Sequence, residues 1–526
     1  MANKLYCKIN LEDSIGFNNN ALFCIGTGRM NLALRKEYYN QLKKVQEDIH
    51  FSYIRGHGLF CDDMAVYHIY EEDGTEKTEY NFTYLDMVFD DYLSMGLKPF
   101  VELGFMPEKL ASGSQTVFYW KGNVTPPSDY NKWAELIKAT VNHWIDRYGR
   151  EEVITWPFEV WNEPNLPGFW KDADMNEYFH LYEVTVKAVK NCDSRIRIGG
   201  PAICGVDDER WLHSFLEHCS NNKIPLDFVT RHAYATDLPE KDGHYTYQNL
   251  RKPEVFMNEL KESRRIIDSF KEYTGMEMHL TEFNTSYTPL NPIHDTNLNA
   301  AYIARLLSEL GDVCASYSYW TFGDVFEEAG VSYTPFSGCF GLLTNGMIPK
   351  PTYWAFSFFR NLRANAVARS EHYIITKDNM GVIYGIAWNP VEGNEDKDIY
   401  LQISIDLENG EYRMVTKLVD ENTCNPLKDW INMGSPANLK KEQTELLLEC
   451  AKPLVKIERL SVTDGNLKFE IPLSSNALCS FEIQRIYPET DRGFHPYRIR
   501  GASVDSLAKN HNKPKSVSLK LSEAFH

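Results

Sequence analysis

The 526-residue sequence predicts an α/β fold, a (β/α)8 TIM barrel with a C-terminal β-sandwich accessory domain. Two observations predict the barrel: short apolar runs of strand-forming residues alternate with longer amphipathic segments, and eight such runs can be counted before about residue 322. A third observation predicts the accessory domain, because beyond about residue 360 the chain changes to short alternating runs separated by Gly, Asn and Asp.

The expected barrel strands follow one another through the first 360 residues. In chain order they are ALFCIGTG from Ala21, FSYIRGHG from Phe51, KPFVELGF from Lys98, PFEVWNEP from Pro157, RIRIGGP from Arg195, LDFVTRHAY from Leu226, MEMHLTEF from Met276 and SYSYWTF from Ser316. Helices are expected between them, for example over Tyr130–Gly149 and Ala300–Gly311, each ending at a glycine that caps it. An open, doubly wound sheet would alternate in the same way, but GTGRM at Gly26 is too short to be its phosphate fingerprint.

The later runs MGVIYGIAWN, IYLQISIDL and NLKFEIPL predict antiparallel strands of a sandwich. We therefore expect three parts: a catalytic barrel over residues 1–360, a sandwich over 361–487 and a polar tail over 488–526. The first 20 residues of the barrel part could pack with the accessory domain. Order of the tail against the barrel and lack of order both stay open.

Composition excludes several classes of partner. The formal net charge of −18 would repel nucleic acid and anionic lipid, because binding to either depends on neutralising phosphates. We find no stretch of about 18 apolar residues that would predict a membrane helix. The eleven cysteines lack CxxC pairs, and the N-terminus lacks a basic start followed by an apolar run. Together these features predict a cytoplasmic protein without a disulfide framework or a zinc site.

Polar residues gather at the carboxyl ends of the predicted strands, where barrel enzymes carry their catalytic groups. A strand that only filled a core would not end in Asn162 and Glu163, because an unpaired carboxamide or carboxylate is costly to bury. The other polar residues of these runs are Arg55, His57, Glu102, His232, Tyr234, Glu282 and Trp320.

Two of these residues, Glu163 and Glu282, form a candidate catalytic pair. Glycoside hydrolysis requires one carboxyl group that protonates the leaving oxygen and a second that meets the anomeric carbon. A separation of about 5 to 5.5 Å would indicate a retaining mechanism, with Glu163 as acid/base at a raised pKa and Glu282 as ionised nucleophile. Tyr234 and Tyr287 are candidate donors to that nucleophile, and Asn162 could bond the 2-hydroxyl of the sugar. The alternative is that both glutamates are ordinary polar strand ends that cap helices.

With these residues identified, the motifs WNEPN and LTEFNTSY resemble those of retaining glycosidases built on (β/α)8 barrels. More narrowly, the chain resembles the β-xylosidases of glycoside hydrolase family 39. The similarity extends over almost the whole barrel, and its motifs are GTGRMNLAL, YIRGHGLFCDD, GFMPEKLASG, FYWKGNVTPP, GGPAICG, RHAY, HDTNLNAAYIARLLSELGD, SYWTFGDVFEE and GLLTNGMIPKPTYWAF.

The resemblance assigns roles to individual residues. It implies that Glu163 is the acid/base and Glu282 the nucleophile, and that no metal or organic cofactor is needed. It places His57 in the wall of a pocket for the glycone sugar. The other residues of that pocket would be Asn162, His232, Tyr234, Tyr287, Trp320 and Glu328. Whether Glu327 or Glu328 faces the sugar cannot be decided from adjacent positions. Family members often self-associate, so we also expect a homo-oligomer.

The same resemblance includes α-L-iduronidases, whose substrate carries a carboxylate. A site for a uronic acid should offer Arg or Lys, yet Leu306–Pro349 contains neither and is acidic at Asp324, Glu327 and Glu328. A bulky Trp320 would close the space that a hydroxymethyl group fills. We therefore expect β-D-xylose, released from the ends of short xylo-oligosaccharides.

Three alternatives stay open. The chain could be an iduronidase-like enzyme or another glycosidase of this family, or it could be a non-catalytic carbohydrate-binding barrel. The long segment Met106–Pro127, with Phe118, Tyr119 and Trp120, could form a wall of the pocket and an aglycone platform, or only a flap packed by its own rings.

Overall fold

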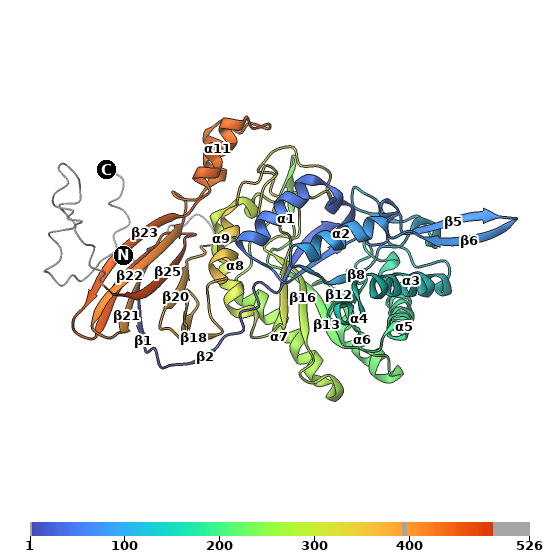
Figure 1. The fold of residues 1–526 in the computed structure, drawn as a ribbon, viewed down its shortest axis with the longest axis horizontal. Helices are drawn as coiled ribbons and strands as arrows, with labels where there is room; N and C mark the ends of the chain where they lie inside the picture. The colour runs from blue at the N-terminus through green and yellow to red at the C-terminus, as the bar shows by residue number, and fades with distance from the viewer. Residues whose placement is uncertain (1–2, 392–396, 488–526) are drawn as a thin grey trace.

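The structure is a computed structural model that describes residues 3–391 and 397–487. Its first part is the expected parallel barrel (Figure 1). The barrel strands are β3 (Cys24–Arg29), β4 (Tyr53–His57), β7 (Lys98–Pro99), β8 (Val101–Leu103), β11 (Pro157–Val160), β12 (Arg197–Ile203), β13 (Phe228–Tyr234), β16 (Met278–Asn284) and β17 (Ser316–Tyr319). They are hydrogen-bonded in the order β7-β4-β3-β17-β16-β13-β12-β11-β8.

The sheet has nine strands because the third barrel strand is divided at Phe100. Its first half, β7, pairs with β4, and its second half, β8, pairs with β11. The Phe100 N–H donates to the carbonyl oxygen of Ile54 at 2.9 Å, which continues the pairing across the division. The ring of eight strands therefore closes at this third strand, as a (β/α)8 barrel requires.

One long helix follows each barrel strand. In order these helices are α1 (Lys36–Asp48), α2 (Thr83–Ser94), α3 (Tyr130–Tyr148), α5 (Met175–Cys192), α6 (Asp208–Asn222), α7 (Pro253–Ser269), α8 (Asn297–Leu310) and α9 (Pro351–Phe359), with the single turn α4 (Arg150–Val153) directly after α3. Gly149 caps α3 at a φ of 87°, as predicted. Gly311 also caps α8, as predicted, but with a φ of −66° it has a right-handed helical backbone and not the positive φ of Gly149. A Cβ at Gly311 would lie 1.9 Å from the carbonyl oxygen of Asn18, and this close approach is what requires a glycine.

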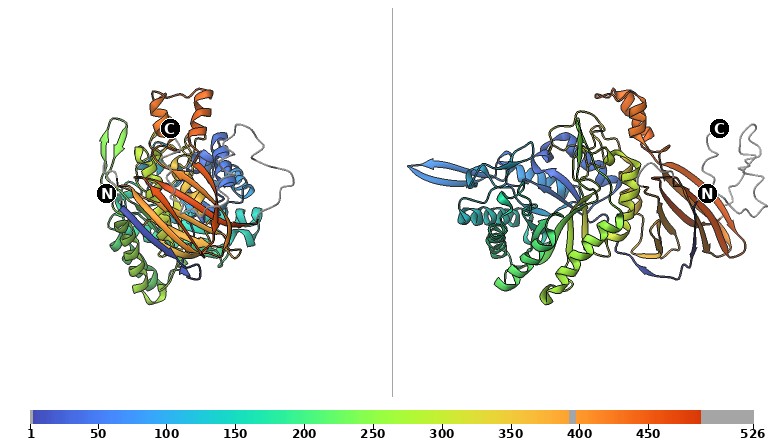
Figure 2. Two further views of the ribbon diagram at one scale, coloured as in Figure 1. Left: turned by 90° about the vertical axis from the view of Figure 1, so that its left-hand side faces the viewer. Right: turned by 180° about the vertical axis from the view of Figure 1, so that it is seen from behind.

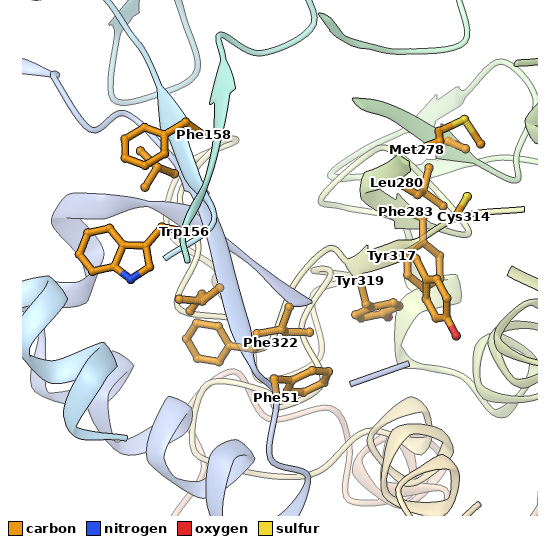
Figure 3. Packing of buried hydrophobic residues seen from close by; sticks show 14 of the residues in the cluster. Phe51, Trp156, Phe158, Met278, Leu280, Phe283, Cys314, Tyr317, Tyr319 and Phe322 are labelled. Atoms are coloured by element: carbon orange, nitrogen blue, oxygen red, sulfur yellow. The ribbon is translucent and has the colours of Figure 1, made fainter. Parts of the chain in front are cut away.

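Apolar side chains fill the space between the strands and the helices. Figure 3 shows part of this cluster, with Phe158 on β11, Met278, Leu280 and Phe283 on β16, and Tyr317 and Tyr319 on β17. The interior of the barrel is different. Cys24, Phe100 and Phe228 form an apolar cluster inside the sheet, whereas Arg55 and Glu159 form a buried ion pair at 2.6 Å. The barrel interior thus combines an apolar layer with charged residues.

The second part consists of two sheets, as the alternating runs predicted. One sheet has the order β1-β21-β24 and the other has the order β2-β18-β19-β20-β25-β22-β23. The strands are β1 (Asn3–Ile9), β2 (Ile15–Gly16), β18 (Asn365–Ser370), β19 (Tyr373–Lys377), β20 (Ile383–Trp388), β21 (Ile399–Asp406), β22 (Gly410–Val419), β23 (Leu454–Val462), β24 (Asn466–Leu473) and β25 (Leu478–Ile486). Figure 2 shows these strands together at one end of the molecule.

The N-terminal segment pairs with the sandwich. Strand β1 runs parallel to β21, and β2 runs antiparallel to β18. On this pairing we propose that residues 3–20 belong with the accessory domain, while the other expected boundaries, at 360 and 487, stay proposals. The tail from Pro488 lies outside the described residues.

Several elements were not expected from the sequence. Between β22 and β23 the chain forms α10 (Pro426–Asn432) and α11 (Lys441–Cys450), which stand out from the sandwich (Figure 1). The hairpin of β5 (Tyr67–Glu72) and β6 (Thr75–Tyr80) extends away from the barrel at the opposite end of the molecule. Two smaller hairpins are formed by β9 (Thr116–Val117) with β10 (Gly122–Asn123) and by β14 (Glu240–Asp242) with β15 (Tyr245–Tyr247). Among the helices of residues 3–391 and 397–487, none combines the length and apolar character needed to span a membrane.

Candidate active site

The turn that carries Glu163 follows directly after β11. Trp161 and Glu163 both have left-handed backbone conformations, with φ values of 70° and 46°, which cost about 1 to 3 kcal/mol each for residues other than glycine. The Glu163 N–H donates to the carbonyl oxygen of Ala202 at 2.9 Å. The Asn165 amide donates to the carbonyl oxygen of Cys204 and accepts from the Cys204 N–H. These bonds to the end of β12 hold the turn in its strained form.

His232 contacts both Glu163 and Glu282. The Nδ1 atom of His232 lies 2.8 Å from Oε1 of Glu163 and 3.5 Å from Oε2 of Glu282. One carboxylate oxygen from each glutamate and one ring nitrogen of His232 lie within 4.8 Å of one another. The two glutamates are only 7% and 4% exposed. The fold therefore brings together two carboxyl groups that are far apart in the sequence.

Glu282 accepts hydrogen bonds from two sides. Arg55 donates to Oε1 from Nη1 at 2.7 Å, and the Tyr234 hydroxyl donates to Oε2 at 2.8 Å. His57 Nε2 lies 3.3 Å from Oε1. Burial alone would raise the pKa of Glu282, but the nearby charges of His232, His57 and Arg55 hold it well below its ordinary value. Glu282 is thus kept ionised, which a nucleophile requires.

Arg55 is the centre of this network and was not predicted as a site residue. Its side chain is fully buried and also contacts Glu159 through Nε at 2.6 Å, Glu102 through Nη2 at 2.9 Å and the Asn162 amide oxygen at 3.0 Å. Burial would lower the pKa of Arg55, but the three carboxylates around it raise this pKa above its ordinary value.

Four residues that organise the site were thus missed: Arg55, Glu102, Glu159 and Asn165. Arg55 and Glu102 were visible as polar residues near strand ends, but a buried supporting role cannot be read from that position. Glu159 lies inside the apolar run before Asn162, and Asn165 lies just beyond Pro164. Only their partners on other strands identify what these side chains do.

His57 lies beside Glu282 and is held on its other ring nitrogen by Glu102. Its Nδ1 is 2.6 Å from Oε2 of Glu102, and its ring centroid is 4.7 Å from that of Trp320 and 6.0 Å from that of Phe118. Burial would lower the pKa of His57, but Glu102 and Glu282 raise it from 6.5 to about 10. The imidazole is therefore positively charged at neutral pH.

Trp320 and Tyr287 take different positions around this cluster. Trp320 is 1% exposed, and a Cβ at Gly26 would lie 2.6 Å from its ring, so the indole packs against the middle of β3. Tyr287 is 41% exposed and its ring lies edge-on to Tyr234 at 6.2 Å. Of the two candidate donors, Tyr234 donates to Glu282, while Tyr287 contacts the ring of Tyr234.

The adjacent glutamates of the loop after β17 have separate environments. Glu327 pairs with Arg29 at 3.0 Å and also with Arg35. Glu328 lies 3.9 Å from Nε2 of His57, and burial together with Glu282, Glu163 and Glu102 raises the pKa of Glu328 well above its ordinary value. Of the two, Glu328 is the one that lies beside His57.

The sequence indicated three acidic residues near the eighth strand, Asp324, Glu327 and Glu328, and the structure neutralises two of them. Asp324 is buried and pairs with Lys350 at 2.8 Å, and Lys350 also pairs with Asp295 at 2.7 Å. Glu327 is bound to arginines, as described above. Asp324 and Glu327 therefore do not present free negative charge, and Glu328 is the acidic group of this loop that lies next to His57.

The long loop after β8 packs against His57 with one aromatic residue and exposes another to solvent. Phe118 lies against His57, as described, and its centroid is 5.3 Å from that of Trp120 and 5.2 Å from that of Phe169. Tyr119 is 64% exposed, and its N–H donates to the carbonyl oxygen of Glu328 at 2.9 Å. The loop is thus packed by its own rings and also lies beside the carboxylates.

Glu163, His232 and Glu282 form the one group of donor atoms, among the residues that the structure describes, with spacing that could suit a metal ion. Arg55 places a permanent positive charge 2.7 Å from Glu282 at the same position. That charge would repel a cation, so the chemistry of this donor set does not fit a resident metal.

Comparison with known proteins agrees with this geometry. The sequence profile described as "Glycosyl hydrolases family 39" matches residues 9–468. A β-xylosidase from Geobacillus stearothermophilus is 49% identical over 478 residues, which are 90% of this chain and 94% of that protein. A β-xylosidase from Caldicellulosiruptor saccharolyticus is 36% identical over 481 residues, 88% of this chain and 94% of that protein. The crystal structure of a monomeric β-xylosidase from Caulobacter crescentus CB15 superimposes with a TM-score of 0.84 at 31% identity, covering 92% of this chain and 100% of that one.

Proposed function

Because the chain belongs to glycosyl hydrolase family 39 and is a glycoside hydrolase of the β-xylosidase type, we propose that it is an exo-acting, retaining β-D-xylosidase. Its substrates would be short xylo-oligosaccharides, from which it removes the terminal β-1,4-linked xylose. The observation that supports the mechanism is the separation of at most 4.8 Å between one carboxylate oxygen of Glu163 and one of Glu282. An inverting enzyme would need about 6.5 to 9.5 Å to admit a water molecule between sugar and base.

In the first step Glu163 donates its proton to the glycosidic oxygen while a carboxylate oxygen of Glu282 bonds to the anomeric carbon. The bond between that carbon and the leaving oxygen breaks, which yields a covalent xylosyl-enzyme. Arg55 and Tyr234, which bind Glu282, keep it ionised and oriented for this attack. The negative charge on Glu282 disappears as the new bond forms.

In the second step Glu163 takes a proton from water, and the water oxygen attacks the anomeric carbon. Glu282 leaves as a carboxylate, and xylose is released with its original β configuration. We assign to His232 the orientation of Glu163: an Nδ1–H that donates to Oε1 leaves Oε2 of Glu163 to carry the transferred proton. The same His232 contact serves both steps.

The remaining predicted residues would bind the glycone sugar. Asn162, His57 and Glu328 offer polar groups to its hydroxyls, while Trp320 and Tyr287 offer ring faces and edges. A neutral pentose suits this set, because Arg55 and His57 already lie against Glu282 and Glu102, and Glu328 adds a further acidic group. A uronic acid would bring its carboxylate toward these acids.

An aryl β-D-xyloside tests the proposal directly. The wild-type protein should release the phenol, and the first product seen by NMR should be β-xylose. Glu282→Ala should lower turnover on the order of 10⁴-fold, and azide should restore turnover and give α-xylosyl azide. Glu163→Ala with azide should give the β-azide, because the nucleophile remains.

Other outcomes would select the alternatives. A non-catalytic carbohydrate-binding barrel would release no phenol from any glycoside. A higher kcat/KM on an aryl α-L-iduronide would identify an iduronidase-like enzyme, and α-xylose as the first product would exclude the retaining mechanism.

Location and assembly extend this proposal. We propose a cytoplasmic enzyme that trims imported oligomers, which is supported by eleven cysteines that are all present as thiols. Cell fractionation followed by an activity assay tests it. Self-association is also proposed, although the similar Caulobacter protein is described as monomeric. Light scattering at micromolar concentration would decide between a monomer and an oligomer.

A further inference from the structure

Three loops at the carboxyl end of the barrel meet at Arg29, the last residue of β3. Its Nη1 atom pairs with Asp63 in the loop after β4, and its Nη2 atom pairs with Glu327 in the loop after β17 at 3.0 Å. The guanidinium carbon lies 5.7 Å from the ring centroid of Trp120, in the loop after β8. We call Arg29, Asp63, Trp120 and Glu327 the Arg29 cluster.

The ion pair within this cluster is largely sheltered from solvent. The side chains of Arg29 and Glu327 are 13% and 7% exposed. Loss of one partner would therefore leave a poorly solvated charge, which is far more costly than the loss of an exposed pair. Arg35 contacts the same carboxylate, but its side chain is 46% exposed. Among the residues that the structure describes, Arg29 is the one that joins Glu327 to two other loops.

The segment that contains Glu327 is fastened at three successive residues. A Cβ at Gly28 would lie 3.0 Å from the ring of Phe326, so this ring packs directly on the end of β3. Glu327 is held by Arg29, and the carbonyl oxygen of Glu328 accepts from the Tyr119 N–H. With Phe326, Glu327 and the Glu328 backbone held in this way, the carboxyl group of Glu328 lies beside His57.

We propose that Arg29 is a positioning residue for the hydrolysis of glycosides by this protein. Through Glu327 it holds Glu328 beside His57, and through Trp120 it holds the loop whose Tyr119 binds the Glu328 backbone. Arg29 acts only through these neighbours. The inference rests on the proposed function, because it assigns to Glu328 the binding of the glycone sugar.

A double-mutant cycle between Arg29 and Glu328 tests this role. Arg29→Met should raise KM and lower kcat/KM about 10- to 100-fold, with kcat changed less than about threefold. In a Glu328→Gln background the same substitution should lower kcat/KM by less than about threefold, because the group that Arg29 positions is already impaired. Arg35→Met is the matched control, since it removes the same charge from the same carboxylate, and it should lower kcat/KM by less than about threefold.

A purely structural role for Arg29 gives a different result. The loss caused by Arg29→Met would then be equal in both backgrounds, or it would match the loss caused by Arg35→Met, and either outcome would overturn the proposal. If Arg29→Met does not fold, Arg29→Lys replaces it, because a single ammonium cannot hold Asp63 and Glu327 in the same fork. All variants are compared on the aryl glycoside that the wild type hydrolyses fastest. A wrong sugar assignment would therefore change the choice of substrate and leave the test of Arg29 intact.

Discussion

The carboxyl end of the barrel and the core of the sandwich bury opposite kinds of side chain. In the barrel, Arg55, Glu102, Glu159, Glu163 and Glu282 are all less than 8% exposed. Among the described residues after 361, the buried polar side chains are Thr376, Asn389 and Thr416, and none of these carries a charge. The sandwich core is otherwise a cluster of apolar residues such as Ile403 and Phe469.

This difference separates two ways of stabilising a protein. An apolar core needs only burial, so each side chain contributes by the surface it removes from water. A buried charge costs free energy unless a partner compensates it, so the charged residues of the barrel depend on one another. The barrel accepts the free-energy cost of burying these charges because hydrolysis of a glycoside requires an ionised and a protonated carboxyl group close together. Substitutions of the buried charges in the barrel should therefore lower both stability and activity, whereas substitutions in the sandwich core should lower stability alone.

The largest effect is expected at Arg55. Arg55→Met removes the cation that contacts Glu102, Glu159 and Glu282, so it should lower the free energy of unfolding by about 3 to 5 kcal/mol. Because Glu282 also loses a donor, kcat/KM should fall on the order of 10² to 10³-fold. Chemical denaturation and kinetics on an aryl glycoside measure the two effects. A variant with full activity would show that Arg55 only fills space.

A comparable loss of stability in the sandwich should leave the chemistry unchanged. Ile403 on β21 is 1% exposed, and Ile403→Ala should cost about 2 to 5 kcal/mol through lost burial and the remaining cavity. At a temperature where the variant is folded, kcat and KM should stay within about twofold of wild type. Ile403→Val, expected to cost about 0.5 to 1.5 kcal/mol, is the conservative control. A large drop in kcat for either variant would mean that the sandwich supports the active site.

A further effect concerns the pH dependence of stability at His57. Because the pKa of His57 is raised from 6.5 to about 10 in the folded protein, its proton contributes stability that is fully present below pH 6.5 and is lost as the pH rises through about 10. The difference in Tm between wild type and His57→Gln should therefore shrink between pH 6.5 and pH 10. In the sandwich, Ile403→Val should shift Tm by an amount that does not change over this range. A constant difference for His57→Gln would show that its proton is not held by Glu102 and Glu282.

Much of the barrel could be predicted because its signals are local. Strand runs such as MEMHLTEF and helical segments such as Tyr130–Tyr148 carry their own periodicity and end signals. The division of the third strand at Phe100 and the helices α10 and α11 could not be predicted in the same way. The division of the third strand depends on its pairing with β4 and β11. The helices α10 and α11 interrupt a region whose sequence otherwise alternates as strands do.

For the active site, the sequence by itself determined which polar residues lie at strand ends, and so which ones could meet above the barrel. Only the tertiary structure decided how their charges are shared: Glu327 is taken by Arg29 and Arg35, Glu328 lies beside His57, and Arg55 lies among three carboxylates. The physical reason is that periodicity is a property of neighbours along the chain. The state of a buried charge depends on partners that the chain brings close from more than 200 residues away, as with Arg55 and Glu282.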